Sequence, residues 1–284
     1  MTFFEALHYG RQHLLSAGVP DYEYDAGALL QYAADVGMGR ILGDPGGELS
    51  PEAQSRYLEM IRKREKRIPL QHILGETCFY GYMFSTREGV LIPRADTEHI
   101  VEQALMLAPQ RQVRFLDLCT GTGCIGISFF LERRAAGFMD EGVLSDLSED
   151  ALKLAKENAG RLQAEVSLVH SDIFDGLKGE CFDIIMSNPP YISLSEMETL
   201  MPEVKDHDPR MALTDEGDGL LFYRRISEEA EEHLNPGGQL FLEIGSGQRN
   251  AVEKLLSDRG FADISCRRDY AGLDRVVYAK TRRI

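Results

Sequence analysis

The stretch Phe115-Leu116-Asp117-Leu118-Cys119-Thr120-Gly121-Thr122-Gly123 decides the fold of this chain of 284 residues. Phe115–Leu118 is apolar enough for a buried strand, and the small apolar run Cys124–Phe130 after the glycines is typical of a helix. Gly121 and Gly123 allow a ligand to approach backbone N–H groups where that helix begins. A strand, a glycine turn and a helix in this order predict an α/β domain that binds a nucleoside.

The glycine loop departs from the fingerprint of dinucleotide-binding proteins. That fingerprint has a third glycine ahead of the pair, and this chain has Cys119 there. A pyrophosphate ligand is therefore less favoured than a nucleoside without one. We expect the loop and the strand before it to supply the first cofactor-binding residues, which are Asp117, Cys119, Thr120, Gly121, Thr122 and Gly123.

Carboxylates follow the next two expected strands. Val143–Asp146 ends in one, and Val166–Val169 is followed by Ser171-Asp172-Ile173. We expect Asp146 to accept hydrogens from both ribose hydroxyls, and Asp172 and the Ile173 N–H to contact an adenine ring. A lone aspartate after a strand more often belongs to a turn, so the order of these residues after the glycine loop is what favours a nucleoside site.

Asn188-Pro189-Pro190-Tyr191 follows the apolar run Phe182–Met186 and predicts the catalytic residues. The side-chain oxygen of Asn188 and the backbone oxygen of Pro189 can together accept both hydrogens of one planar NH2 group, while the proline rings fix the backbone between them. The alternative is structural, because two consecutive prolines also end a strand and prevent a helix from starting. With the nucleoside motifs upstream, the pattern favours chemistry at an amide or amino nitrogen.

These motifs together resemble the class I S-adenosylmethionine-dependent methyltransferases. The resemblance implies a doubly wound α/β sheet of seven strands and S-adenosylmethionine as cofactor. Asn-Pro-Pro-Tyr occurs both in adenine N6 methyltransferases and in enzymes that methylate the glutamine side-chain amide, so it indicates the type of nitrogen and leaves the polymer open.

Three further segments resemble the peptide chain release factor glutamine methyltransferases, namely Arg67–Gly75, Leu91–Glu98 and Asp269–Val277. This resemblance implies methyl transfer to N5 of the glutamine in the Gly-Gly-Gln motif of release factors, on or near the ribosome. The chain departs from that family at Ala95 and Cys119, where many members carry proline and glycine. Neither change affects the proposed chemistry, since both side chains are small.

The chain divides into three expected parts. Residues 1–76 form a small helical bundle for substrate recognition, 77–89 a hairpin-like linker, and 90–284 the methyltransferase domain. Glycines around Met38 are expected to break the helices as a loop. The expected bundle helices are Thr2–Ala17, Asp21–Asp35 and Ser50–Lys66, and a later helix is expected over Leu220–Leu234.

Two polar segments have more than one interpretation. The basic run Arg62–Arg67 is expected to be a solvated helix end favoured by the helix dipole, and contact with a partner or ribosomal RNA is the alternative. The polar loop Met201–Arg210 is long for a compact domain, and loops of this kind are often lids over a site.

The formal net charge of −15 opposes a sequence-independent grip on nucleic acid, which needs clustered lysine and arginine. Methylation of adenine in DNA or RNA is therefore the second hypothesis, and a non-catalytic cofactor-binding module is the third. The five cysteines lack a Cys-x-x-Cys pair and are expected to be reduced thiols, with no metal site. Met1–Tyr9 lacks the pattern of a signal peptide or membrane span, which predicts a cytoplasmic protein.

Overall fold

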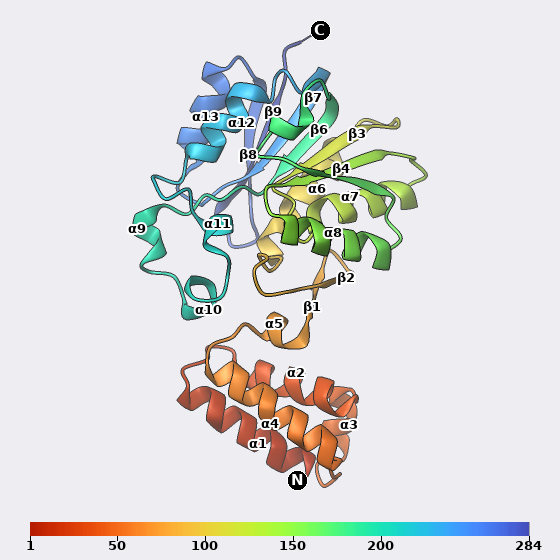
Figure 1. Ribbon diagram of the computed structural model, residues 1–284, viewed down its shortest axis with the longest axis vertical. Coiled ribbons are helices and arrows are strands. Elements are labelled where there is room, and N and C mark those ends of the chain that lie inside the picture. Colours follow the sequence, from red (N-terminus) through yellow and green to blue (C-terminus); the bar gives the residue numbers. More distant parts are fainter. Residues whose placement is uncertain (284) are drawn as a thin grey trace. The chain divides into compact units, whose positions relative to one another are not determined.

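The computed structural model describes residues 1–283, and the chain forms two compact units (Figure 1). The first unit consists of Met1–Glu76 together with the segment Met201–His207, and the second of Thr77–Leu200 together with Asp208–Ile284. The recognition role predicted for residues 1–76 stays a prediction.

The first unit is a bundle of helices around a buried apolar core. Thr2 caps the first helix in a capping box with Glu5, and Ser50 caps the fourth. The expected loop around Met38 is wrong, since Gly37 precedes a short helix whose Ile41 is buried in the core. The helices are α1 (Phe3–Ser16), α2 (Tyr22–Ala34), α3 (Met38–Gly43), α4 (Pro51–Glu65) and α5 (Leu70–Leu74), with α10 (Pro202–Lys205) in the added segment.

The interpretation of the basic run as a solvated helix end is wrong at Arg64. This side chain is 5% exposed, because Tyr57, Ile61 and Arg64 follow one another at helical spacing on the buried face of α4. Its Nε donates to Asp25 Oδ2 at 2.7 Å and its Nη2 to Glu203 Oε1 at 2.8 Å. A buried arginine of this kind needs its carboxylate partners, so the cluster holds the segment Met201–His207 within the first unit.

The second unit contains the predicted seven-stranded sheet, with strand order β5-β4-β3-β6-β7-β9-β8. The neighbours β3, β4, β5, β6 and β7 pair in parallel, and β9 pairs antiparallel with both β7 and β8. The strands are β3 (Arg114–Leu118), β4 (Glu141–Asp146), β5 (Val166–His170), β6 (Phe182–Ser187), β7 (Leu234–Glu243), β8 (Ala262–Arg268) and β9 (Asp274–Lys280).

Helices cover both faces of this sheet, which confirms the doubly wound fold (Figure 1). Alternate residues of β3 enter two different cores, with Phe115 packed among residues of α6, α7 and α8 and Leu116 among residues of α12 and α13. These helices are α6 (Glu98–Leu107), α7 (Cys124–Ala135), α8 (Glu149–Arg161), α12 (Leu221–Glu229) and α13 (Arg249–Asp258).

Short elements complete the unit. A two-stranded sheet of β1 (Glu76–Phe79) and β2 (Tyr82–Ser85) stands where the strand pair is predicted. The segment after Asn188-Pro189-Pro190-Tyr191 contains α9 (Leu194–Met197) and α11 (Arg210–Leu213), and short 3₁₀ turns span Ala95–Thr97 and Asp175–Leu177.

One predicted boundary is wrong by several residues. The helix expected over Leu220–Leu234 ends at Glu229, and Leu234 instead begins β7 and pairs with Phe182 of β6. Burial of Leu234 in the sheet core outweighs its helix propensity, as tertiary packing often does. Over residues 1–283, every helix is too short or too polar to cross a membrane.

The Glu203 carboxylate predicts an acid-dependent loss of stability. Burial opposes its ionisation, but hydrogen bonds from Arg67 and Arg64 outweigh this and lower its pKa to about 2. Because the folded-state pKa lies below the ordinary value of 4.5, the stabilisation is complete above that value and is lost as pH falls towards 2. Glu203→Gln should lower the free energy of unfolding by about 3 kcal/mol near neutral pH.

Chemical denaturation of both proteins across this pH range measures the effect, and the difference between them should shrink as the pH falls. Glu59→Gln is the matched control, since Glu59 pairs with Lys63 on the exposed side of α4, the helix that carries Arg64, and should change stability by less than about 0.5 kcal/mol. A pH-independent difference for Glu203→Gln would contradict the assignment.

Candidate active site

A pocket lies at the carboxyl ends of the parallel strands, next to β3. The chain order of the strands changes direction there, since β4 and β5 lie on one side of β3 and β6 and β7 on the other. This is the place where ligands bind in open α/β sheets. The pocket opens to solvent, and the space not filled by atoms within its bounds is about 970 Å³, open solvent included. Apolar walls come from Val90, Leu91, Ile92, Leu118, Ile125, Ala151, Ile173 and Phe222.

The glycine loop forms one wall and has a left-handed backbone at alternate positions. Cys119 has φ 61°, Gly121 55° and Gly123 83°. Cys119 therefore adopts the conformation that glycine takes without strain, at the position where many members of the family it resembles carry glycine. A Cβ at Gly123 would also lie 2.7 Å from Ile127 Cδ1, so glycine is required there for two reasons.

Asp117 supports this loop from below and does not line the pocket. Its Oδ2 accepts hydrogen bonds from Thr120 Oγ1 at 2.6 Å and Gly126 N at 2.9 Å. Its Oδ1 is buried and has no hydrogen-bond partner among the described residues. Burial raises the pKa of this carboxyl to about 7, in spite of those two hydrogen bonds. Of the other five loop residues predicted to bind cofactor, four line the pocket and Gly123 does not; the four are Cys119, Thr120, Gly121 and Thr122.

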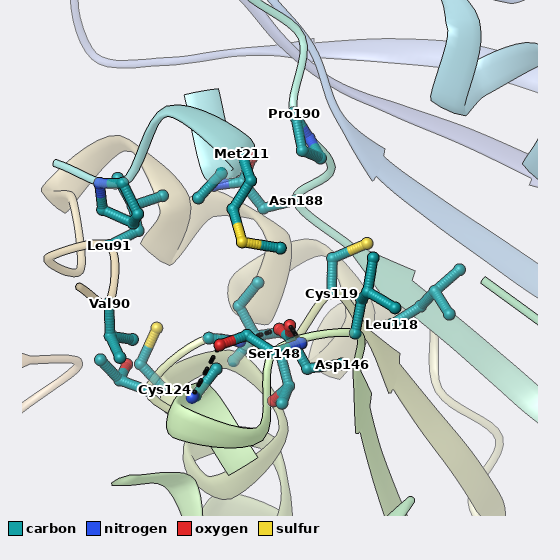
Figure 2. Close-up of a pocket in the computed structure, with 18 of the residues that line it drawn as sticks. Val90, Leu91, Leu118, Cys119, Cys124, Asp146, Ser148, Asn188, Pro190 and Met211 are labelled. Carbon is teal, nitrogen blue, oxygen red and sulfur yellow. Dashed lines mark hydrogen bonds between the residues drawn. The ribbon is translucent and has the colours of Figure 1, made fainter. Parts of the chain in front are cut away.

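Asp146 is held rigidly at the end of β4. Gly121 N donates to its Oδ2 at 2.9 Å, and Ser148 N donates to its Oδ1 at 2.8 Å. Burial raises the pKa of Asp146, and the two backbone donors oppose that shift. A carboxylate has about four acceptor positions, so each oxygen keeps one for a ligand hydroxyl. Figure 2 shows Asp146 and Ser148 on the side of the pocket opposite Asn188 and Pro190.

Asp172 and Ile173 line the pocket after β5. Asp172 Oδ1 accepts from Arg225 Nη1 of α12 at 2.7 Å, so part of its acceptor capacity is already used. Ile173 has φ 51°, which is strained for a β-branched residue and is maintained by burial of its side chain. Sequence reasoning missed Arg225, because no motif in α12 distinguishes it from its exposed neighbour Arg224.

Asn188 lines the pocket and is fixed by a neighbour that the sequence did not point to. Its Nδ2 donates to Thr97 Oγ1 at 3.2 Å. Pro190 also lines the pocket, whereas Pro189 and Tyr191 are not among its lining residues. The predicted catalytic tetrapeptide therefore presents two of its four side chains to this space.

Tyr191 instead lies against a buried acid. Its hydroxyl donates to Glu243 Oε1 at 3.3 Å, and its backbone oxygen accepts from Gln248 Nε2 at 2.8 Å. Burial raises the pKa of Glu243 to about 7 against the Thr97 hydroxyl, the charge of Arg275 and the Tyr191 hydroxyl, which lower it. Glu243 was missed, although it ends β7 and the rule that pointed to the other strand ends applies to it as well.

The end of the segment predicted as a lid, Met201–Arg210, also reaches the pocket. Pro209 lines it, and Arg94 on the pocket wall forms an ion pair with Asp208; Met211 and Ala212, just after the segment, line it as well. Figure 2 shows Met211 on the same side of the pocket as Asn188. That this segment opens and closes stays a prediction.

These residues fit S-adenosylmethionine. The fixed carboxylate of Asp146 suits a ribose diol, the apolar side chains suit a purine, and the left-handed loop leaves space beside Gly121, where an added Cβ would meet nothing within 4 Å. Asp146 and Asp172 give the pocket a negative charge that suits a sulfonium cation.

The geometry of Asp146 predicts a specific loss of cofactor affinity. Asp146→Asn keeps the shape but turns one oxygen into a donor that faces a backbone N–H. Calorimetry should show S-adenosylmethionine binding weakened by roughly tenfold to a hundredfold. Asp150→Asn, on the exposed face of α8, is the control and should leave affinity unchanged. Unchanged affinity in Asp146→Asn would remove this residue from the ribose site.

Two family models match the chain, one over most of its first 76 residues and one within the remainder. Residues 5–75 match the PrmC N-terminal domain, and residues 98–218 match the methyltransferase small domain. A release factor glutamine methyltransferase of Fusobacterium nucleatum is 42% identical over 95% of this chain and 76% of its own length. The one from Geobacter sulfurreducens is 39% identical over 97% of this chain and 95% of its own length.

Among solved structures, a methyltransferase from Pyrococcus furiosus superposes with a TM-score of 0.51 at 20% identity, covering 71% of this chain and 89% of its own, and shows the shared fold. The sequence similarity to these curated relatives extends over nearly the whole chain. The chain therefore belongs to the family of release factor glutamine methyltransferases.

Proposed function

We propose that this protein transfers a methyl group from S-adenosylmethionine to N5 of the glutamine in the Gly-Gly-Gln motif of peptide chain release factors, on or near the ribosome. The observation that carries methyl transfer to an NH2 nitrogen is the Asn188 carboxamide on the pocket wall, with its nitrogen bound to Thr97 and its oxygen without a partner in the described structure. Similarity to release factor glutamine methyltransferases supports the substrate. Substrate recognition is assigned to the first unit.

The cofactor-binding residues are those that meet at the carboxyl ends of β3, β4 and β5. Asp146 accepts from the ribose hydroxyls, the loop around Gly121 contacts the donor's amino-acid part, and Asp172 and Ile173 contact the adenine. When bound, S-adenosylmethionine supplies an electrophilic methyl group on a cationic sulfur. Asp117 acts indirectly by holding Thr120 and the first turn of α7.

The residues after β6 position the substrate nitrogen. An amide nitrogen is a weak nucleophile, because its lone pair is delocalised into the carbonyl group. Asn188 Oδ1 and the Pro189 backbone oxygen accept its two hydrogens and fix its direction of approach, while Pro190 and Tyr191 pack beside the amide. Positioning of the nitrogen and the preorganised electrostatic field of the site lower the activation barrier. The extra proton of the methylated amide is then released to water.

The identity of the modified polymer tests the proposal. Purified protein is incubated with labelled S-adenosylmethionine and, separately, with a release factor, with DNA and with RNA, and the products are mapped by mass spectrometry. We expect one methyl group on the Gly-Gly-Gln glutamine, and none when that glutamine is replaced by glutamate. Methyl transfer to adenine, the alternative that Asn-Pro-Pro-Tyr also allows, would overturn the proposed substrate.

Asn188→Ala should lower turnover much more than cofactor affinity. Loss of one oriented acceptor should cost about 2 to 4 kcal/mol in the transition state, by analogy with an oxyanion-hole donor. Single-turnover kinetics measure the loss and calorimetry the affinity. Asn235→Ala is the control, because Asn235 bonds to Asp183 at the opposite end of the sheet. Near-normal turnover in Asn188→Ala would exclude the proposed role of this residue.

A further inference from the structure

Thr97 stands where a helix cap is expected and does not act as one. It precedes the first residue of α6, but its side chain makes no capping hydrogen bond. A threonine at this position normally accepts from the first turn of the helix, which is worth about 1 kcal/mol. Here Oγ1 accepts from Asn188 Nδ2 at 3.2 Å, and Thr97 is 3% exposed. The hydroxyl is therefore committed to Asn188 and shielded from solvent.

Glu243 is a buried acceptor that contacts the Asn188-Pro189-Pro190-Tyr191 segment through Tyr191. It lies at the end of β7, is 1% exposed, and receives the Tyr191 hydroxyl on Oε1 at 3.3 Å. The Thr97 hydroxyl acts to lower the pKa of this carboxyl group, and Glu243 Oε2 has no hydrogen-bond partner among the described residues. Because Asn188 Nδ2 is a donor, Thr97 Oγ1 offers it a lone pair, which leaves the Thr97 proton for another acceptor such as Glu243.

This order of donors and acceptors fixes which atom of the Asn188 carboxamide is left for the substrate. With Nδ2 bound to Thr97, Oδ1 is the atom available to accept from an incoming NH2 group. If the carboxamide were rotated by half a turn, Nδ2 would face that NH2 group, and two sets of donors would oppose each other. The rotated state would leave the substrate hydrogen without its acceptor.

We infer that Thr97 and Glu243 are positioning residues that hold the Asn188 carboxamide with its oxygen directed at the substrate nitrogen. The inference rests on the proposed function, because it concerns the same substrate amide. The inference gives Thr97 a role. Thr97 lies in Leu91–Glu98, a segment that resembles the release factor glutamine methyltransferases and to which the sequence assigned no function.

The test uses the full-length protein and three substitutions at this position. Thr97→Val keeps the volume and removes the hydroxyl, Thr97→Ser keeps the hydroxyl, and Thr97→Ala replaces the valine variant if that one melts below the assay temperature. Turnover is measured at about pH 8.5, where the Glu243 carboxyl is ionised.

Thr97→Val should lower kcat by roughly tenfold to a hundredfold and leave the S-adenosylmethionine Kd within about twofold, while Thr97→Ser restores most of the activity. Thr281→Val is the matched control. Thr281 is also a buried threonine of the second unit whose hydroxyl donates to a glutamate, at 3.3 Å from Glu231 Oε1, and it does not line the pocket. Its substitution should leave kcat unchanged.

A double-mutant cycle separates positioning from a general effect on structure. If Thr97 acts through Asn188, adding Thr97→Val to Asn188→Ala should lower kcat no further than Asn188→Ala alone. Multiplicative effects, or a kcat for Thr97→Val within about twofold of the wild type, would overturn the inference.

The cycle is measured on whichever polymer the unmodified protein methylates. If that polymer proves to be DNA or RNA, the proposed function fails, and the coupling between Thr97 and Asn188 is still read on the adenine amino group. Non-additivity there would support the positioning role, and additivity would contradict it.

Discussion

The hydrogen bond from Gly121 N to Asp146 Oδ2 is the interaction on which the rest of the site depends. It joins the loop after β3 to the end of β4, and the Ser148 N–H fixes the other carboxylate oxygen at the start of α8. Two neighbouring strand ends and one helix start are thereby held in one arrangement. Because strands β3 to β7 run parallel, the remaining functional residues reach the same edge of the sheet without long side chains.

The sequence predicted those parts of the fold that depend on local pattern. The order of the strands and helices around the glycine loop follows from periodicity and turn residues over short distances. The predictions are wrong where contacts between residues distant in the sequence determine the structure. Arg64 is charged and lies in a basic run, yet the carboxylates that bury it are distant in the sequence, at positions 25 and 203.

The residues of the candidate site also fall into those that local sequence pattern could predict and those that depend on distant packing. Strand-end residues such as Asp146, Asp172 and Asn188 could be predicted, because the sheet rule places every parallel strand end at one edge. Thr97 and Arg225 could not, since each comes from a helix and reaches the site only through the packing of that helix. Asp117 shows the limit of the rule, because a strand-end carboxylate can serve the loop instead of the ligand.

Two neighbouring carboxylates at this edge, Asp117 and Asp146, are not paired with a cation in the described residues, whereas Asp172 pairs with Arg225. Burial raises the pKa of Asp117 to about 7, and the charge of Asp146 adds to that rise. Neither carboxylate has a lysine or arginine partner among the hydrogen bonds described for it. A ligand with a positive charge relieves this repulsion, and a neutral one does not. The same electrostatic field therefore favours a sulfonium donor over the uncharged thioether that remains after methyl transfer, so that product release becomes easier once the transfer is complete.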